Sequence, residues 1–240
     1  MTSRVERFGD AALYLGDCRE IALGLTADAV ISDPPYSIPH QFSAQVGKPG
    51  HGTRTLSWDW DNAMSAAEII AVFAPLLKGC DAAFVFCGLR QASLLAEAAA
   101  AAGLVDKMAA WTKLCPPPPA PGNWWPSAFE LAVYAHRPGA WFGDDNPIRS
   151  NVFCYDALRH GNGDKNGHPT QKPLALMQRI VKAIAPPGTM ILDPFMGSGT
   201  TGVAAATHGR KFIGIEIDER WFDVACRRLD AETRQERLAV

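Results

Sequence analysis

Four consecutive residues, Asp33-Pro34-Pro35-Tyr36, place an acid, two prolines and an aromatic ring directly after the apolar run 29–32. Proline lacks a backbone N–H, so the pair ends a strand, stiffens the chain and leaves carbonyl oxygens free as acceptors. The Asp33 carboxylate and the Pro34 carbonyl can accept the two hydrogens of an exocyclic amino group, while Tyr36 stacks on the ring that carries it. An amino group held in this way has its lone pair turned out of conjugation and aimed at an electrophile. Taken alone, the motif is equally typical of a simple turn that ends a strand.

A second stretch, DPFMGSGTTG at 193–202, joins an apolar strand to a helix. Glycines at such a turn let the backbone approach a ligand closely, and the first helical N–H groups are available to bind it. No lysine follows Gly199 or Gly202, which excludes a phosphate-binding P-loop. Gly197, Gly199 and Gly202 match the dinucleotide pattern GxGxxG, and Glu216 ends the next strand, where a ribose-binding acid belongs.

The position of the glycine turn in the chain argues against a dinucleotide enzyme. The chain ends at Val240, soon after Glu216, whereas a dinucleotide fold needs several further strand–helix units after this turn. Earlier strands must therefore complete the sheet, which brings the strand ending in Asp33 beside the glycine turn at one carboxyl edge. A sulfonium methyl carried on the turn would then face the amino group held by Asp33. Binding both partners in line lowers a barrier by about 7–11 kcal/mol.

The elements that must position these motifs alternate between apolar strands and helices. This alternation predicts an α/β domain with a doubly wound, mostly parallel, buried sheet. The expected strands are 11–15, 29–32, 82–87, 189–192 and 211–217, with a strand pair at 108–114 and 129–135. The expected helices are 65–77, 91–102, 173–184 and 200–207, with a last helix from about Glu219. Residues 37–62 and 143–166 are expected to be loops.

Composition narrows the class of protein. The 240 residues are 48% hydrophobic, which suits one large domain with a sizeable core. A net charge of -2 gives no global signal for nucleic acid, so a polyanion must meet a local basic patch. The six cysteines lack metal-ligand spacing, so we expect reduced thiols and no metal. No apolar run has the length of a membrane span and the N-terminus lacks a signal-peptide segment, so we expect a cytoplasmic protein without a membrane partner.

Three motifs in this order, DPPY, DPFMGSGTTG and HPTQKP at 168–173, resemble the β-type amino-group DNA methyltransferases, which use S-adenosylmethionine. YLGDC at 14–18 and FELAVYAHRPG at 129–139 extend the resemblance over roughly residues 10–230. The resemblance implies a Rossmann-like methyltransferase fold in circularly permuted order. It also implies methyl transfer to the N6 amino group of adenine in duplex DNA after base flipping. Transfer to N4 of cytosine or to an RNA base stays open, because Asp33 can hold either amino group and Tyr36 can stack on any unpaired base. The basic loops and the long segment after DPPY argue against a glutamine amide as the target.

The resemblance also implies roles for individual residues. Asp33, Pro34, Pro35 and Tyr36 would grip the flipped base. The implied cofactor-binding residues are Asp17, Cys18, His168, Thr170, Lys172, Asp193, Phe195, Gly197, Ser198, Gly199, Thr200 and Glu216. Among them, Glu216 would bind the ribose hydroxyls and Lys172 would lie near the methionyl end, where a cation suits the cofactor's carboxylate.

Extraction of a base requires contacts that hold the duplex. We expect a single catalytic domain, 1–240, with a DNA-contacting loop at 37–62 and a short target-recognition segment at 143–167. Phosphate contacts are expected from Lys48, Arg54, Arg149, Arg159 and Lys165. Because this segment is short and the chain is mildly acidic, we also expect a homodimer. No endonuclease-like segment is recognisable, so modification without cleavage is expected.

Overall fold

The computed structural model describes residues 4–36, 45–46, 54–55, 64–116, 125–143, 149–158 and 166–238. The strands are β1 (Arg4–Phe8), β2 (Ala11–Leu15), β3 (Ala29–Ser32), β4 (Gln45–Val46), β5 (Arg54–Thr55), β6 (Ala82–Cys87), β7 (Val105–Thr112), β8 (Phe129–His136), β9 (Val152–Cys154), β10 (Met190–Asp193) and β11 (Lys211–Glu216). The helices are α1 (Cys18–Ile21), α2 (Ala66–Gly79), α3 (Leu89–Ala101), α4 (Leu174–Ile184), α5 (Thr200–Thr207) and α6 (Glu219–Leu238).

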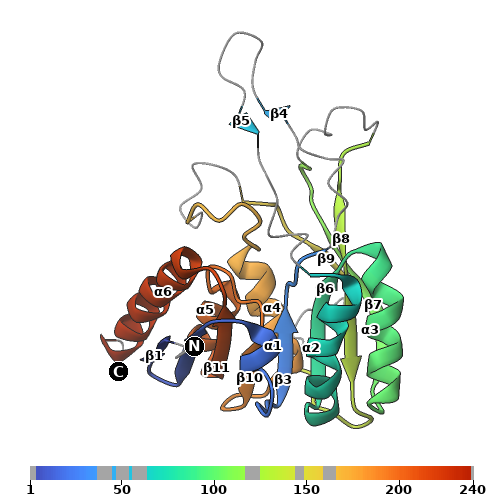
Figure 1. Cartoon of the computed structure of the whole chain (residues 1–240), viewed down its shortest axis with the longest axis horizontal. Coiled ribbons are helices and arrows are strands. Elements are labelled where there is room, and N and C mark those ends of the chain that lie inside the picture. Colours follow the sequence, from blue (N-terminus) through green and yellow to red (C-terminus); the bar gives the residue numbers. More distant parts are fainter. Residues whose placement is uncertain are drawn as a thin grey trace.

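Nine of the described strands form one sheet in the order β1-β2-β11-β10-β3-β6-β8-β7-β9 (Figure 1). The neighbours from β2 to β6 are all parallel. Antiparallel pairs join β1 to β2, β6 to β8 and β8 to β7, and β9 adds a parallel edge. The mostly parallel α/β sheet expected from the sequence is confirmed.

The central strands are apolar at nearly every position because both faces of the sheet are covered. In β3, Ala29 and Ile31 pack into a core with α4, α5 and α6, whereas Val30 packs into a second core with α1, α2 and α3. The strand β6 divides in the same way, with Phe84 in the first core and Val85 in the second. Helices therefore lie on both faces, as a doubly wound parallel sheet requires (Figure 1).

Helix starts follow local chemistry. A capping box begins α2, since Ser65 N–H donates to Glu68 Oε2 at 2.8 Å and Glu68 N–H donates to Ser65 Oγ at 3.3 Å. The helix α3 begins at Leu89, two residues earlier than expected, because Gln91 Oε1 accepts the N–H of Gly88 at 2.9 Å and caps that end.

Five short elements were not expected: β1, α1, β9 and the two-residue strands β4 and β5. The segment 143–166 is not all loop, because β9 pairs with β7 through Ala110 and Val152. This strand has three residues and only Phe153 is buried, so its sequence shows no repeating pattern of apolar residues that would predict a strand. Likewise β1 is a largely exposed edge strand, and α1 is a single turn. The structure describes only β4 and β5 of the predicted loop 37–62. It also does not describe residues 144–148 and 159–165.

The second glycine of the turn is fixed by packing. Gly199 begins α5 with a φ of 79°, in the left-handed region. A Cβ at this position would lie 2.9 Å from Ala225 Cβ and 3.2 Å from Leu229 Cδ1. The absence of a side chain therefore lets α6 pack directly against the start of α5.

Replacement of this glycine tests the packing argument. We expect Gly199→Ala to lower the free energy of unfolding by about 1–3 kcal/mol through overpacking, in addition to about 1–2 kcal/mol for the left-handed backbone. The matched control is Gly24→Ala, at a φ of 82° with nothing within 4 Å of the added Cβ. Urea unfolding should show a clearly larger loss for the first variant, and equal losses would contradict the role of α6.

Candidate active site

The two motifs meet where the strand order of the sheet reverses. The strands β3 and β10 are parallel neighbours, with Val30 opposite Leu192. From β3 the chain continues to β6 on one side, and from β10 it continues to β11 on the other. Asp33 directly follows β3, and Asp193 ends β10. The two motifs therefore share the carboxyl edge at the switch point, where open α/β sheets bind ligands.

A buried carboxylate ties the glycine turn to β3 and α5. Asp193 Oδ1 accepts the hydroxyl of Ser32 at 2.6 Å and the N–H of Phe195 at 3.1 Å, and Oδ2 accepts the hydroxyl of Thr201 at 2.6 Å. Burial raises the pKa of Asp193 to about 6, although these three donors favour its ionised form. Protein donors engage both oxygens, so Asp193 shapes the cradle through the elements that it joins.

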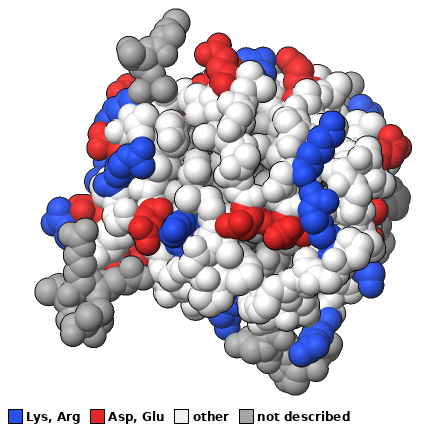
Figure 2. Space-filling view, turned by 90° about the horizontal axis from the view of Figure 1, so that it is seen from below, with Lys and Arg blue, Asp and Glu red and all other residues white. Residues whose placement is uncertain are grey.

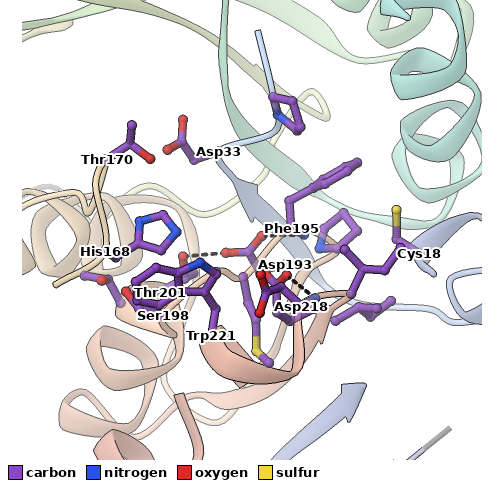
Figure 3. Close-up of a pocket in the computed structure, with 18 of the residues that line it drawn as sticks. Cys18, Asp33, His168, Thr170, Asp193, Phe195, Ser198, Thr201, Asp218 and Trp221 are labelled. Atoms are coloured by element: carbon purple, nitrogen blue, oxygen red, sulfur yellow. Dashed lines mark hydrogen bonds between the residues drawn. The ribbon is translucent and has the colours of Figure 1, made fainter. Parts of the chain in front are cut away.

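A cavity opens along this edge between the glycine turn, the end of β2 and the segment before α4 (Figure 3). In the view shown, Asp33 and Thr170 lie toward its upper end and Asp218 and Trp221 toward its lower end. The lining includes most of the predicted site residues: Asp17, Cys18, Asp33, Pro35, His168, Thr170, Lys172, Asp193, Phe195, Gly197, Ser198, Thr200 and Glu216. Pro34, Tyr36 and Gly199 are not part of this lining.

The lining contains both titratable acids and side chains that are uncharged at neutral pH. Burial, reinforced by Asp218, raises the pKa of Glu216 to about 7, although its carboxylate accepts the N–H of Asp218 at 2.8 Å. Burial also raises the pKa of the Cys18 thiol to about 12 and lowers the pKa of His168 to about 4. At neutral pH both side chains are therefore uncharged, and His168 packs edge-on against Trp221 with ring centroids 4.5 Å apart.

Asp17 caps a short helix. Its carboxylate accepts the N–H of Arg19 at 2.8 Å and pairs with the Arg19 guanidinium at 2.6 Å, which lowers the pKa of Asp17. Asp17 therefore stays ionised at the mouth of the cavity.

The sequence suggested that both carbonyl oxygens of the proline pair are free, but one of them is engaged. Pro35 O accepts a hydrogen bond at 2.7 Å from Gln91 Nε2, and Gln91 Oε1 holds the N–H of Gly88. Gln91 is fully buried, and buried backbone acceptors need a partner. The N-terminal turn of α3 thus holds the DPPY segment in place.

A compact charge cluster surrounds Asp33. Lys172 Nζ donates to Asp33 Oδ2 and, at 3.0 Å, to Glu130 Oε2. Lys113 Nζ lies 2.7 Å from Glu130 Oε1. The hydroxyl of Tyr36 lies 2.8 Å from Asp33 Oδ1 and 2.9 Å from Glu130 Oε2. Two lysines thus balance two carboxylates, and one phenol bridges the carboxylates.

These contacts fix the protonation of the cluster. Burial disfavours the charged form of Lys172, but Asp33 and Glu130 outweigh it and raise the pKa of the ammonium group. Burial opposes the ionisation of Glu130 too, yet Lys172 and Lys113 lower its pKa to about 2. Burial raises the pKa of Asp33, against the attraction of Lys172. Glu130 is therefore the firmly ionised member of the pair of acids.

The cluster also changes the interpretation of Lys172. It lines the cavity as predicted, but the carboxylates that it contacts belong to the chain itself and not to a cofactor. Sequence reasoning missed Glu130, Lys113 and Gln91. For Glu130 a signal existed, because it is the one acid in the mostly apolar strand FELAVYAH. It lies near the start of β8, which runs antiparallel to β6 and therefore begins at the carboxyl edge of the parallel strands.

The predicted DNA-binding residues are described only in part. Lys48, Arg159 and Lys165 lie outside the described residues, and Arg54 is described only as part of the backbone of β5. Arg149 lines a second cavity with Lys107 and Tyr134, and no described residue lines both cavities. The position of Arg149 therefore gives no support to a phosphate contact next to Asp33.

Within the described ranges, no group of three or more His, Cys, Asp or Glu side chains is arranged to hold a metal ion. The same part of the chain has no helix that is both long and apolar enough to cross a membrane.

Several known proteins are similar to this chain. It is 47% identical to the DNA adenine methyltransferase YhdJ of Escherichia coli K12 over 83 residues, which cover 35% of this chain and only 28% of that protein. It is 29% identical to the type II methyltransferase M2.DpnII of Streptococcus pneumoniae in an alignment of 234 residues, which covers 85% of this chain and 83% of the relative.

Solved structures agree on the fold. The crystal structure of the M1.HpyAVI–SAM complex superposes with a TM-score of 0.64 at 30% identity, over 91% of this chain and 99% of that one. The cytosine-N4-specific PvuII DNA methyltransferase has a TM-score of 0.65 over 95% of this chain and 96% of its own, but at 16% identity it shows the fold alone.

The family model described as DNA methylase, which groups N6 and N4 methyltransferases, matches residues 27–227. This span contains Asp33, the glycine turn and Glu216, which the structure brings to one cavity. The chain therefore belongs to the N6/N4 DNA methylase family.

Proposed function

We propose that this protein is a site-specific DNA methyltransferase that transfers a methyl group from S-adenosylmethionine to the N6 amino group of adenine in duplex DNA. The observation that carries the proposal is the placement of Asp33 and the glycine turn on one cavity at the β3–β10 switch point. Similarity to YhdJ, named a DNA adenine methyltransferase, and to M1.HpyAVI, solved as a SAM complex, supports it.

The cavity suits the proposed cofactor. Glu216 would accept the ribose hydroxyls, and Phe195 with the neutral Cys18 thiol would provide apolar surface for the adenine ring. Gly197, at a φ of 52°, presents bare backbone to the cavity, and an added Cβ would lie 3.3 Å from His168 Nε2. Bound S-adenosylmethionine supplies an electrophilic methyl group at this edge of the sheet.

The chain's own residues would orient the target. Asp33 and the Pro34 carbonyl would accept the two amino hydrogens, and Tyr36 would stack on the base at a gain of about 1–3 kcal/mol. Gln91 holds the segment rigid through Pro35 O, so the acceptors are positioned before the base arrives. Preorganisation of this kind converts binding energy into alignment of the reacting atoms.

We place the duplex over the carboxyl edge, where a flipped base reaches Asp33. The opposite end of the molecule, seen from below in Figure 2, carries acidic and basic side chains interspersed, which does not favour a polyanion. The DNA-contacting loop 37–62 and the recognition segment 143–167 belong to this proposal, with Lys48, Arg54, Arg159 and Lys165 as phosphate contacts.

Transfer to N4 of cytosine is the alternative that the shared fold keeps open. The fold of the cytosine-N4-specific PvuII enzyme is the same, and Asp33 can accept a hydrogen from either amino group. The name of YhdJ, which is 47% identical over 83 residues, favours adenine.

The first test is methyl transfer from labelled S-adenosylmethionine to unmethylated duplex DNA, followed by mass analysis of the nucleosides. We expect N6-methyladenine from the wild type and a loss of roughly a hundredfold or more in Asp33→Ala, because the amino group loses its charged acceptor. Cofactor binding by the variant, measured in parallel, should be retained. Label in N4-methylcytosine would overturn the choice of base, and label absent from DNA would overturn the proposal.

A pH test addresses Glu216. Its pKa of about 7 means that the acid is largely protonated at pH 6 and ionised at pH 8, and the carboxylate is the better acceptor for hydroxyl hydrogens. We therefore expect cofactor affinity to be about tenfold weaker at pH 6 than at pH 8. The matched control Glu216→Gln keeps every other titrating group, including Asp218 and those of the cofactor. Calorimetry should show that this variant binds the cofactor more weakly and that its affinity changes less between pH 6 and pH 8. An unchanged pH dependence of the affinity would contradict the assignment.

We also propose a homodimer, since a chain with a net charge of -2 and a short recognition segment has little surface of its own for the duplex. Light scattering is expected to give about twice 25.9 kDa for the protein, to which a bound duplex adds its own mass. A mass of one chain, with and without DNA, would remove this part of the proposal.

A further inference from the structure

The cluster around Asp33 conflicts with the task that the proposed function gives this residue. Both oxygens of its carboxylate already accept hydrogen bonds, Oδ1 from the Tyr36 hydroxyl at 2.8 Å and Oδ2 from Lys172 Nζ. A base amino group that is to be held by Asp33 must therefore share an oxygen with one of these donors or replace it, and an oxygen freed of its donor is the stronger acceptor. The displaced donor lies in a partly buried cluster, where a polar group left without a partner is unfavourable.

Glu130 lies where a displaced donor can be received. The Tyr36 oxygen is almost equally far from Glu130 Oε2, at 2.9 Å, as from Asp33 Oδ1, at 2.8 Å. A phenol has one hydrogen, so it can donate to only one of the two carboxylates at a time. Rotation of the hydroxyl hydrogen moves the bond from Asp33 to Glu130 with little displacement of heavy atoms. Lys172 Nζ also contacts Glu130 Oε2, at 3.0 Å, and keeps this partner when Asp33 turns to another donor.

Glu130 itself is held firmly. Its second oxygen, Oε1, is paired with Lys113 at 2.7 Å, and the Lys113 ammonium lies 5.0 Å from the centroid of the Trp111 ring. Glu130 lies on β8 opposite Trp111 of β7, and Lys113 directly follows β7, so the acceptor is built into the sheet. Glu130 is not among the residues that line the cofactor cavity.

We propose that Glu130 is a positioning residue that takes over the hydrogen bond of Tyr36 and retains Lys172 when the target base arrives, so that Asp33 Oδ1 becomes available to the amino group. The inference rests on the proposed transfer to a base amino group. It implies that Asp33 is covered by the protein's own donors until a base competes for it. The two lysines and two carboxylates stay balanced throughout, because only hydrogen bonds change partners.

The alternative is that Glu130 only stabilises the sheet. A structural role and the proposed role differ in how Glu130 couples to the Tyr36 hydroxyl. In Glu130→Gln the neutral amide is a weaker acceptor than a carboxylate, so the phenol donates to Asp33 and competes with the base. Removal of the hydroxyl by Tyr36→Phe, which keeps the stacking ring, then removes the competitor. A structural role predicts no such compensation.

The experiment measures single-turnover methyl transfer to duplex DNA, with the full chain, in the wild type, Glu130→Gln, Tyr36→Phe and the double variant. We expect Glu130→Gln to slow transfer roughly tenfold to a hundredfold, the range of one charge-assisted hydrogen bond, with cofactor affinity unchanged. Tyr36→Phe should restore part of the rate that Glu130→Gln loses, because it removes the hydroxyl that competes with the base for Asp33. If Tyr36→Phe restores none of that rate, so that the losses multiply, or if Glu130→Gln matches the wild type, the inference is overturned.

The matched control is Asp81→Asn, the same acid-to-amide change at the opposite end of the β6–β8 pair, where the exposed Asp81 lies 3.7 Å from Arg137. It should transfer methyl groups at the wild-type rate. If Glu130→Gln does not fold, Glu130→Asp keeps the charge and withdraws the acceptor by one methylene, and it should show the same dependence on Tyr36→Phe. An inactive wild type would refute the proposed function itself, whereas an active wild type with multiplying losses refutes only the role of Glu130.

Discussion

The parallel pairing of β3 with β10 is the constraint on which the site depends. It brings together residues 161 positions apart, and the buried hydrogen bond from Ser32 to Asp193 secures it at the carboxyl edge. Side chains alternate along a strand, so a shift of the register by one residue would turn Ser32 to the other face and separate the DPPY segment from the glycine turn. The apolar residues of β3 prevent that shift, because each face must meet its own core.

The charges at this edge serve orientation more than stability. Removing two lysines and two carboxylates from water costs several kcal/mol per ion, and their mutual attraction about offsets that cost only in good geometry. A hydrophobic cluster would stabilise the same space at least as well. The arrangement of Lys172 between Asp33 and Glu130 is better explained by what it does for Asp33, whose ionised form it favours against burial and whose carboxylate it holds at the cavity.

The sequence predicted those parts of the fold that are determined locally. The strand 82–87 and the helix 200–207 have the expected bounds, because an unbroken apolar run and a glycine turn followed by small residues leave few alternatives. The edge strands β1 and β9 were missed because one is largely exposed and the other has a single buried residue. Within the site, contiguous motifs were found, whereas Glu130, Lys113 and Gln91 act through contacts with residues distant in sequence, which no local pattern encodes.

The choice between adenine and cytosine has to arise outside the DPPY segment. Asp33 and Pro34 would contact only the amino group, and that group offers the same two hydrogens in both bases. The bases differ in the distance from the amino group to the sugar, because a purine carries its N6 on a fused ring system and a pyrimidine carries its N4 on a single ring. Asp33 is fixed to the sheet by β3 and by Gln91, so the amino group of either base would be held at the same place. The sugar and its phosphates would then lie at different distances from Asp33 for adenine and for cytosine. Under the proposed function, the residues that hold the DNA backbone would therefore also contribute to the choice of base, since they would set its distance from a fixed acceptor.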